Sequence, residues 1–154
     1  MTMSDYSDLE REIKNAPEPK ILPAGSEVKA RIILVNSGVS EKNDAKWYTP
    51  VFDIPSETLA PSFSDFFWDL LDENKIEPKQ VQAAKRQYRM FGEAFDIDWS
   101  RPLSWEDDLP GKEGWMILGI QKDKSGEYPD KNKVQKYVTG PPNRKPRTDD
   151  DIPF

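Results

Sequence analysis

Alternating apolar and polar side chains mark the first clear element of this chain, residues 28–35. Side chains two residues apart share one face of a strand, so this segment predicts a strand with one apolar face. The expected inward side chains are Val28, Ala30, Ile32 and Leu34. Lys29 and Arg31 then fall on the outward face.

Further segments show strand patterns as well. These are residues 47–54, 62–71, 115–122 and 133–138. Pro50 interrupts the earliest of them and predicts a sheet edge or a bulge, because proline cannot donate a ladder hydrogen bond. Residues 62–71 are dense in aromatic side chains, and we expect Phe66 and Trp68 to pack in the core.

A helix is predicted between the third and fourth strands. Glu77-Pro78 places proline at an early helical position, and Gly92 is expected to follow the last turn. Its apolar face comprises Val81, Ala84, Tyr88 and Phe91. A second face carries Lys79, Gln82, Arg86 and Arg89. Residues 95–110 show no regular pattern and predict an insertion or a long loop.

Three strands, a helix and two strands predict a mainly β fold with one helix. This order is compatible with an OB-like five-stranded barrel whose helix lies between the third and fourth strands, although an open β-sandwich has the same order. We expect a flexible N-terminal arm (1–20), an OB-like domain (21–139) and a disordered linker with an acidic tail (140–154). In the arm, Ser7 is expected to cap a short helix, with Glu10 completing a capping box.

Composition narrows the class of protein. Apolar residues are 36% and charged residues 32% of the 154 residues, which fits a modest core with polar ends. The chain has no cysteine, so a reducing cytoplasm is the expected compartment. We expect neither a membrane span nor a secretory signal, because there is no apolar run of about 18 residues and no basic-then-apolar start.

The negative charge is concentrated at the two ends of the chain. Net charge is −6; residues 1–20 carry five acids and three bases, and residues 149–151 carry three acids. Residues 21–148 carry 20 acids and 19 bases and are therefore close to neutral. A nearly neutral domain can still hold a local basic groove for a phosphate backbone.

Binding to single-stranded nucleic acid needs flat side chains for stacking bases and basic side chains along the backbone. The predicted strands and the last hairpin supply both kinds. The candidates are Lys29, Arg31, Trp47, Tyr48, Lys122, Lys124, Tyr128, Lys131, Lys133 and Tyr137. Either Trp47 or Tyr48 must face away from the core, and Lys133 is expected to share a face with Tyr137. The basic helix face is either a solvated surface or an extension of this path.

Enzyme chemistry has little support in this sequence. Histidine and cysteine, the commonest general base and the thiol nucleophile, are both absent. The densest internal acidic cluster, Glu106-Asp107-Asp108, lies in one predicted loop, whereas a two-metal nuclease needs carboxylates that converge from separate strands. Lys124-Ser125-Gly126 lacks the spacing of a phosphate-binding loop. We therefore expect no catalysis, no cofactor and no metal.

The last six residues are Asp149-Asp150-Asp151-Ile152-Pro153-Phe154. They have too little apolar surface to fold alone, but Phe154 can fill an apolar pocket while the acids meet a basic rim. The plainer interpretation is a solvated end that aids solubility. This stretch resembles the acidic tip of bacterial single-stranded DNA-binding proteins. The resemblance implies that Asp149 to Phe154 dock onto replication, recombination and repair enzymes.

The central part also resembles phage-encoded proteins found with recombination and replication genes. The likeness rests on Pro23-Ala24-Gly25, on Trp68-Asp69-Leu70 and on Leu109 to Gly114. We therefore expect sequence-nonspecific single-stranded DNA binding in phage DNA replication and recombination, in the cytoplasm of a bacterial host. A homo-oligomer, first of all a dimer, is a further expected partner. The alternative is an interaction protein that imitates the host tip without binding DNA itself.

Overall fold

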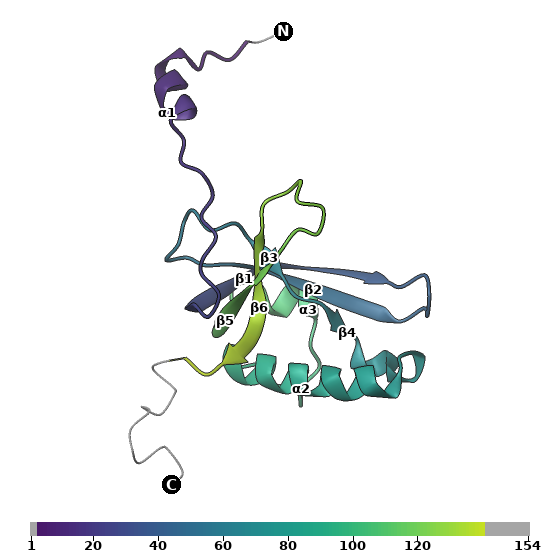
Figure 1. The fold of residues 1–154 in the computed structure, drawn as a ribbon. Helices are drawn as coiled ribbons and strands as arrows, with labels where there is room; N and C mark the ends of the chain where they lie inside the picture. The colour runs from purple at the N-terminus through teal and green to yellow at the C-terminus, as the bar shows by residue number, and fades with distance from the viewer. Residues whose placement is uncertain (1–2, 141–154) are drawn as a thin grey trace.

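The computed structural model describes residues 3–140, which form one antiparallel sheet with helices around it (Figure 1). The strands are β1 (Glu27–Val39), β2 (Lys46–Asp53), β3 (Phe63–Ser64), β4 (Phe67–Trp68), β5 (Glu113–Gln121) and β6 (Lys131–Val138). The helices are η1 (Ser7–Leu9), α1 (Glu10–Lys14), η2 (Leu70–Lys75), α2 (Pro78–Phe95) and α3 (Trp105–Asp108). The predicted mainly β class with helices is confirmed.

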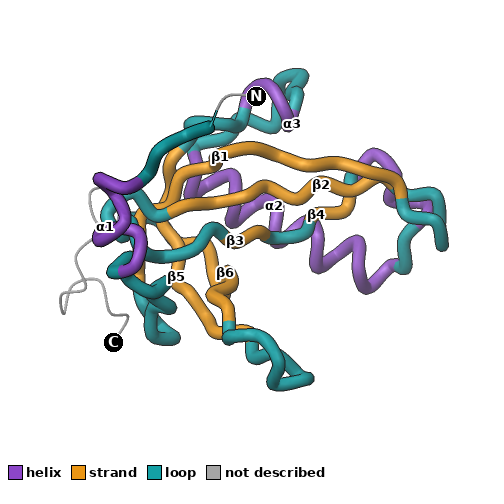
Figure 2. The backbone as a smooth tube through the Cα atoms, turned by 90° about the horizontal axis from the view of Figure 1, so that it is seen from above, coloured by secondary structure: helices purple, strands orange, loops and turns teal. Residues whose placement is uncertain are grey.

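The strand order is β3-β2-β1-β5-β6, with β4 also paired to β2. Seen from above, β1 and β2 run side by side as a long hairpin, and β4 lies beside β2 (Figure 2). Within residues 3–140 no ladder joins the edge strands β3 and β6, so the sheet is not closed. The helix α2 follows β4 in the chain and precedes β5, as the sequence predicted for its helix.

Pro50 explains why the predicted third strand is two short strands. The Pro50 carbonyl accepts a hydrogen bond from the Asp65 amide, so its edge faces the β3–β4 segment. Proline has no N–H to return that bond, and the ladder is interrupted at this point. β3 pairs with β2 before the break and β4 after it.

A bulge in β1 changes which side chains face the core. The register with β2 shifts between Ile32 and Leu34, which inserts one residue into β1. Ala30, Ile32 and Val35 are buried, whereas Leu34 is exposed. The prediction that Leu34 points inward is therefore wrong, because the strict alternation ends at the bulge.

A second bulge lies in β6. Ile117 pairs with Lys136 and Leu118 pairs with Val134, so Gln135 has no opposite residue in β5. The extra residue places Lys133 and Tyr137 on opposite faces, and Tyr137 is only 6% exposed. The prediction that these two side chains share a face is wrong.

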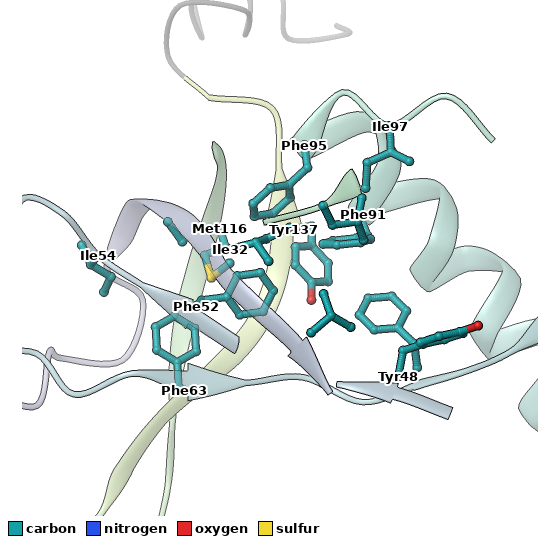
Figure 3. Packing of buried hydrophobic residues seen from close by; sticks show 14 of the residues in the cluster. Ile32, Tyr48, Phe52, Ile54, Phe63, Phe91, Phe95, Ile97, Met116 and Tyr137 are labelled. Carbon is teal, nitrogen blue, oxygen red and sulfur yellow. The ribbon is translucent and has the colours of Figure 1, made fainter. Parts of the chain in front are cut away.

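Aromatic side chains form the centre of the core. Phe52, Phe67 and Phe91 are fully buried, and they come from β2, β4 and α2. Figure 3 shows Phe52 and Phe91 around the Tyr137 ring, which lies 6.4 Å and 5.2 Å from them between ring centroids. α2 therefore covers one end of the sheet with an apolar stripe, as its sequence pattern predicts.

The end of α2 differs from the prediction. The helix continues through Gly92 to Phe95, and Asp96 closes it in the left-handed conformation with φ 55°. Gly92 is required inside the helix for packing, since a Cβ there would overlap the Trp99 indole. Gly92 therefore allows close contact with Trp99, and the prediction that it follows the last turn of the helix is wrong.

Residues 95–110 belong to the core and are not a separate insertion. Trp105 and Leu109 are buried, and the Trp105 ring stacks on Tyr48 with centroids 4.4 Å apart. Ser104 caps α3 by accepting a hydrogen bond from the Asp107 amide. Periodicity did not reveal this segment because α3 is a single turn.

The N-terminal arm stands off from the sheet on the side away from α2 (Figure 1). Ser7 is not the helix cap; the Ser7 amide instead donates to the Asp5 carboxylate at 2.9 Å. The body begins at Leu22, whose amide and carbonyl both pair with the buried Asn132 side chain. Among residues 3–140, no helix has the length and apolar character needed to cross a membrane.

The Tyr137 hydroxyl is expected to contribute measurably to stability. It donates to the Asp65 carboxylate at 2.6 Å, and burial, reinforced by the negative charge of Asp65, raises the pKa of Tyr137 well above its ordinary value. We expect Tyr137→Phe to lower the free energy of unfolding in urea by about 1–3 kcal/mol. The matched control, Tyr128→Phe on the exposed loop, should change it by less than about 0.5 kcal/mol. Equal effects would contradict this assignment.

Candidate nucleic-acid interface

Three aromatic side chains gather on the outward face of β2 and β4. This aromatic cluster consists of Trp47, Phe66 and Trp68. The Phe66 ring lies 6.0 Å from Trp47 and 4.8 Å from Trp68 between centroids, and Phe66 is 42% exposed. Trp47 and Trp68 are half-buried. The cluster thus offers ring surface to solvent while its geometry is held by mutual packing.

Strand alternation accounts for the outward position of this cluster. Trp47 and Trp68 are directly opposite each other in the β2–β4 ladder, so they share a face. Phe67, between Phe66 and Trp68, is fully buried in the core. The prediction that Phe66 and Trp68 are core residues is wrong for Phe66, and Trp68 is only half-buried. Three consecutive aromatics in a strand cannot all face inward, and this signal was present in the sequence.

Two neighbours position the cluster. Gly38 lies opposite Trp47 in β1, and a Cβ at Gly38 would overlap the indole, so the ring rests on bare backbone. Gln87 of α2 donates hydrogen bonds to the Phe66 carbonyl at 2.9 Å and to the Asp65 carboxylate at 3.1 Å. Trp68 additionally packs against a small apolar cluster of Ala45, Ile76 and Val81. The aromatic surface is therefore preorganised.

A groove separates the two edge strands of the sheet. Its volume is about 320 Å³. Its lining is Val51, Ser62, Phe63, Ser64, Gln121, Lys131, Asn132 and Lys133. Lys131 and Lys133 are exposed and supply positive charge, while Val51 faces outward on β2, four residues along from Trp47. The aromatic cluster and this edge groove therefore lie along one continuous outer face of β2.

The β5–β6 loop flanks the edge groove. A second hollow of about 460 Å³ lies there, lined in part by Lys122, Lys124 and Tyr128, and Lys131 lines both hollows. Asp123 orders this loop by accepting hydrogen bonds from the Ser125 hydroxyl at 2.6 Å and the Tyr128 amide at 2.9 Å. The Ser125 hydroxyl first, and then the Tyr128 amide, lower the pKa of Asp123. Tyr128 itself is 67% exposed.

Two predicted stacking residues are core residues instead. Tyr48 packs face to face on Trp105, and Tyr137 lies among Phe52, Phe91 and Phe95 (Figure 3). Both rings are buried and neither has a free face for a base, so the prediction that Tyr48 and Tyr137 bind DNA by stacking is wrong. Trp47 is the outward member of the Trp47–Tyr48 pair.

The basic residues of β1 lie apart from the aromatic cluster. Lys29 is exposed and lies opposite Trp115 of β5. It precedes Gly38, the β1 residue beside Trp47, by nine residues, and nine residues of extended strand span about 30 Å. Arg31 donates to both Asp53 oxygens, at 3.1 Å and 2.6 Å. This bidentate pair neutralises Arg31 locally, and Asp53 competes with any phosphate for its guanidinium.

The acidic cluster of residues 106–108 has a structural use. The Ser104 amide donates to Asp108 at 2.8 Å, and the Ser104 hydroxyl donates to Asp107 at 3.0 Å. Across residues 3–140, the structure contains no group of three or more acidic side chains placed to hold a metal ion.

The basic face predicted for the helix is at the surface. On α2, Lys79, Arg86 and Arg89 are exposed.

The predicted partner-binding residues, Asp149 to Phe154, lie outside the residues that the structure describes. Comparison of the chain with protein-family models and with curated protein sequences gives no match.

Replacing Gly38 tests whether Trp47 is positioned by contact. We expect Gly38→Ala to displace the indole and to change the near-ultraviolet circular dichroism of the protein, because the added Cβ has no space under the ring. Gly119→Ala is the control, since its Cβ would meet mainly the flexible Lys133 side chain at 3.3 Å. Identical spectra for Gly38→Ala and the unaltered protein would contradict this arrangement.

Proposed function

We propose that this protein binds single-stranded DNA with little sequence preference and without catalysis. The observation that carries the proposal is the outward aromatic cluster of Trp47, Phe66 and Trp68 on the same face as a lysine-lined groove. Stacking on aromatic rings is tolerant of sequence because every base has a π-face, and lysines follow the phosphate backbone. A duplex keeps its bases stacked inside, so exposed rings favour single strands.

The strand order supports an OB-like barrel as the finer description of this fold. β3 and β4 together take the place of a third strand, α2 follows them, and β5 and β6 complete the order. The hydrogen bond from Tyr137 of β6 to Asp65 links the two edges that a closed barrel would join. In OB folds, the second and third strands and the loop between the last two strands bind oligonucleotides. The aromatic cluster and the β5–β6 loop occupy corresponding positions.

Local charge supports the same assignment despite a net charge of −6. Lys122, Lys124, Lys131 and Lys133 surround the edge groove and the adjacent loop. Asp123, Glu127 and Asp130 are the acids of the same loop, and Asp123 already accepts hydrogen bonds from Ser125 and Tyr128. Four lysines close together can hold a phosphate backbone even on an acidic protein.

The acidic tail completes the proposal. Asp149 to Phe154 would recruit replication, recombination or repair enzymes, and the support is their resemblance to the tip of bacterial single-stranded DNA-binding proteins. The setting that follows is phage DNA replication and recombination in the cytoplasm of a bacterial host. A protein that uses the tip without binding DNA is the alternative, and a direct DNA titration distinguishes the two.

Titration of a fluorescent oligothymidylate is the test of the proposal. We expect binding that weakens steeply as salt concentration rises, because neutralised phosphates release counterions. Lys131→Ala combined with Lys133→Ala should make the salt slope shallower by about 0.7 for each lost contact. Lys20→Ala, whose ammonium pairs with Glu57, is the control. Absence of binding at low salt would reject the proposal in favour of the alternative.

Truncation of the aromatic cluster tests stacking directly. Trp47→Ala and Phe66→Ala should each weaken oligothymidylate binding by about 5- to 150-fold, which corresponds to ~1–3 kcal/mol for one stacked base. Leu59→Ala removes an exposed apolar side chain from the turn after β2, at the opposite end of that strand from Trp47, and should leave the affinity unchanged. Normal affinity in both aromatic variants, with their folds intact by circular dichroism, would show that the DNA path lies elsewhere.

A further inference from the structure

We infer that the N-terminal arm of one copy of this chain docks into a groove beside α2 of a second copy. The inference goes beyond the proposed function, because neither surface includes the aromatic cluster or the edge groove. It rests on an uncovered apolar stripe, on a groove that matches it in chemistry, and on the direction in which the arm leaves the sheet.

The arm carries an apolar stripe that no other part of residues 3–140 buries. Tyr6, Leu9 and Ile13 are spaced three and four residues apart, so they line one side of η1 and α1. They are 62%, 47% and 58% exposed, and η1 and α1 contain no buried residue. A short helix is stable in water mainly when its apolar side packs against something, so this stripe is expected to have a partner surface.

A groove lies beside α2 and is lined mainly by apolar side chains. Its volume is about 880 Å³, and its lining includes Leu71, Tyr88, Trp99 and Leu103. Leu71 is 90% exposed and Trp99 is 37% exposed. An exposed leucine beside an exposed tryptophan is a typical receptor for apolar side chains of a docked helix.

The rim of this α2 groove has charges that complement the arm. Arg89 supplies positive charge, and Glu93 and Asp96 supply negative charge near the end of α2. Lys85 and Arg101 also line the groove, but they already pair with Glu73 at 3.5 Å and with Asp98 at 3.4 Å. The remaining acid, Asp69, already accepts hydrogen bonds from the Leu71 amide and the Tyr48 hydroxyl.

The helical part of the arm, residues 5–14, is acidic. Its acids are Asp5, Asp8, Glu10 and Glu12, and its bases are Arg11 and Lys14, of which Lys14 pairs with Glu10 at 2.7 Å. This net negative charge suits Arg89 at the groove. Paired charges of this kind set orientation more than affinity.

The direction of the arm favours a second copy over its own groove. The chain joins the body at Leu22, which pairs with Asn132 at the start of β6, and α2 packs on Tyr137 near the other end of that strand. Figure 1 shows the arm and α2 on opposite sides of the sheet. An arm that points away from its own groove reaches the groove of another molecule, as in exchange of identical elements between protomers.

Site-directed cross-linking of the full chain tests this directly, because the sequence contains no cysteine. We would prepare Leu9→Cys in one chain and Leu71→Cys in another, mix them, and add a short bismaleimide. We expect a covalent heterodimer of roughly twice 17.7 kDa, formed much faster than by either variant alone. Leu59→Cys replaces Leu71→Cys as the control, since Leu59 is exposed but does not line the groove.

Light scattering of the unaltered chain provides a second measurement. We expect a concentration-dependent mass above that of one chain, and a single-chain mass for Leu9→Asp combined with Ile13→Asp. Cross-linking no faster than in the Leu59→Cys control, together with a single-chain mass throughout, would overturn the inference. Cross-linking within one chain carrying both cysteines at high dilution would also overturn it.

One further outcome identifies a different occupant. If removal of residues 141–154, but not the arm variants, increases the reactivity of Leu71→Cys toward a thiol reagent, the tail fills the groove and the inference fails. Oligothymidylate affinity of the arm variants is measured in parallel. Arm variants that lose self-association but still bind DNA would show that the two properties are separate. Self-association of the unaltered chain without DNA binding would support this inference and reject the proposed function.

Discussion

The missing N–H of Pro50 is the constraint on which the outward aromatic face depends. Because Pro50 cannot complete the ladder, the segment opposite β2 breaks into β3 and β4, with Asp65 and Phe66 between them. Asp65 is then free of strand pairing and accepts the Tyr137 hydroxyl and the Gln87 amide. The break therefore ties β6 and α2 to the middle of the sheet.

Phe66 owes its exposed position to the same break. Its amide donates to Asp65 at 2.9 Å and its carbonyl accepts from Gln87, so local hydrogen bonds replace a ladder. A continuous strand would satisfy these groups equally well but would bring no α2 side chain to this point. Phe67 is buried in the core, and the Phe66 ring lies at the surface between Trp47 and Trp68. One local interruption thus serves stability and presentation of the aromatic cluster.

Much of the architecture could be predicted from alternation and periodicity, and the errors have specific physical causes. The strand around Ala30 and Ile32 and the stripe of Val81, Ala84 and Phe91 were recognisable because tertiary structure keeps their period. Leu34 and Tyr137 were assigned to the wrong faces because each lies beyond a bulge, and a single inserted residue reverses every later side chain. Gly92 resembled a helix stop, but its role is contact with Trp99, which only the tertiary structure reveals.

The candidate site was harder to predict than the fold, because exposure of an aromatic side chain depends on its neighbours. The outward Trp47 ring lies close against β1 because Gly38 leaves room beneath it, and Arg31 is already paired with Asp53, which lies opposite in the next strand. Neither partner is adjacent in sequence, so composition and spacing carry no trace of either effect. Lys133 is exposed even though its predicted face was wrong, because long charged side chains stay at the surface whichever way a register shifts. Basic residues are therefore the more transferable part of a sequence-based interface prediction, and aromatic residues become informative once the strand pairing is known.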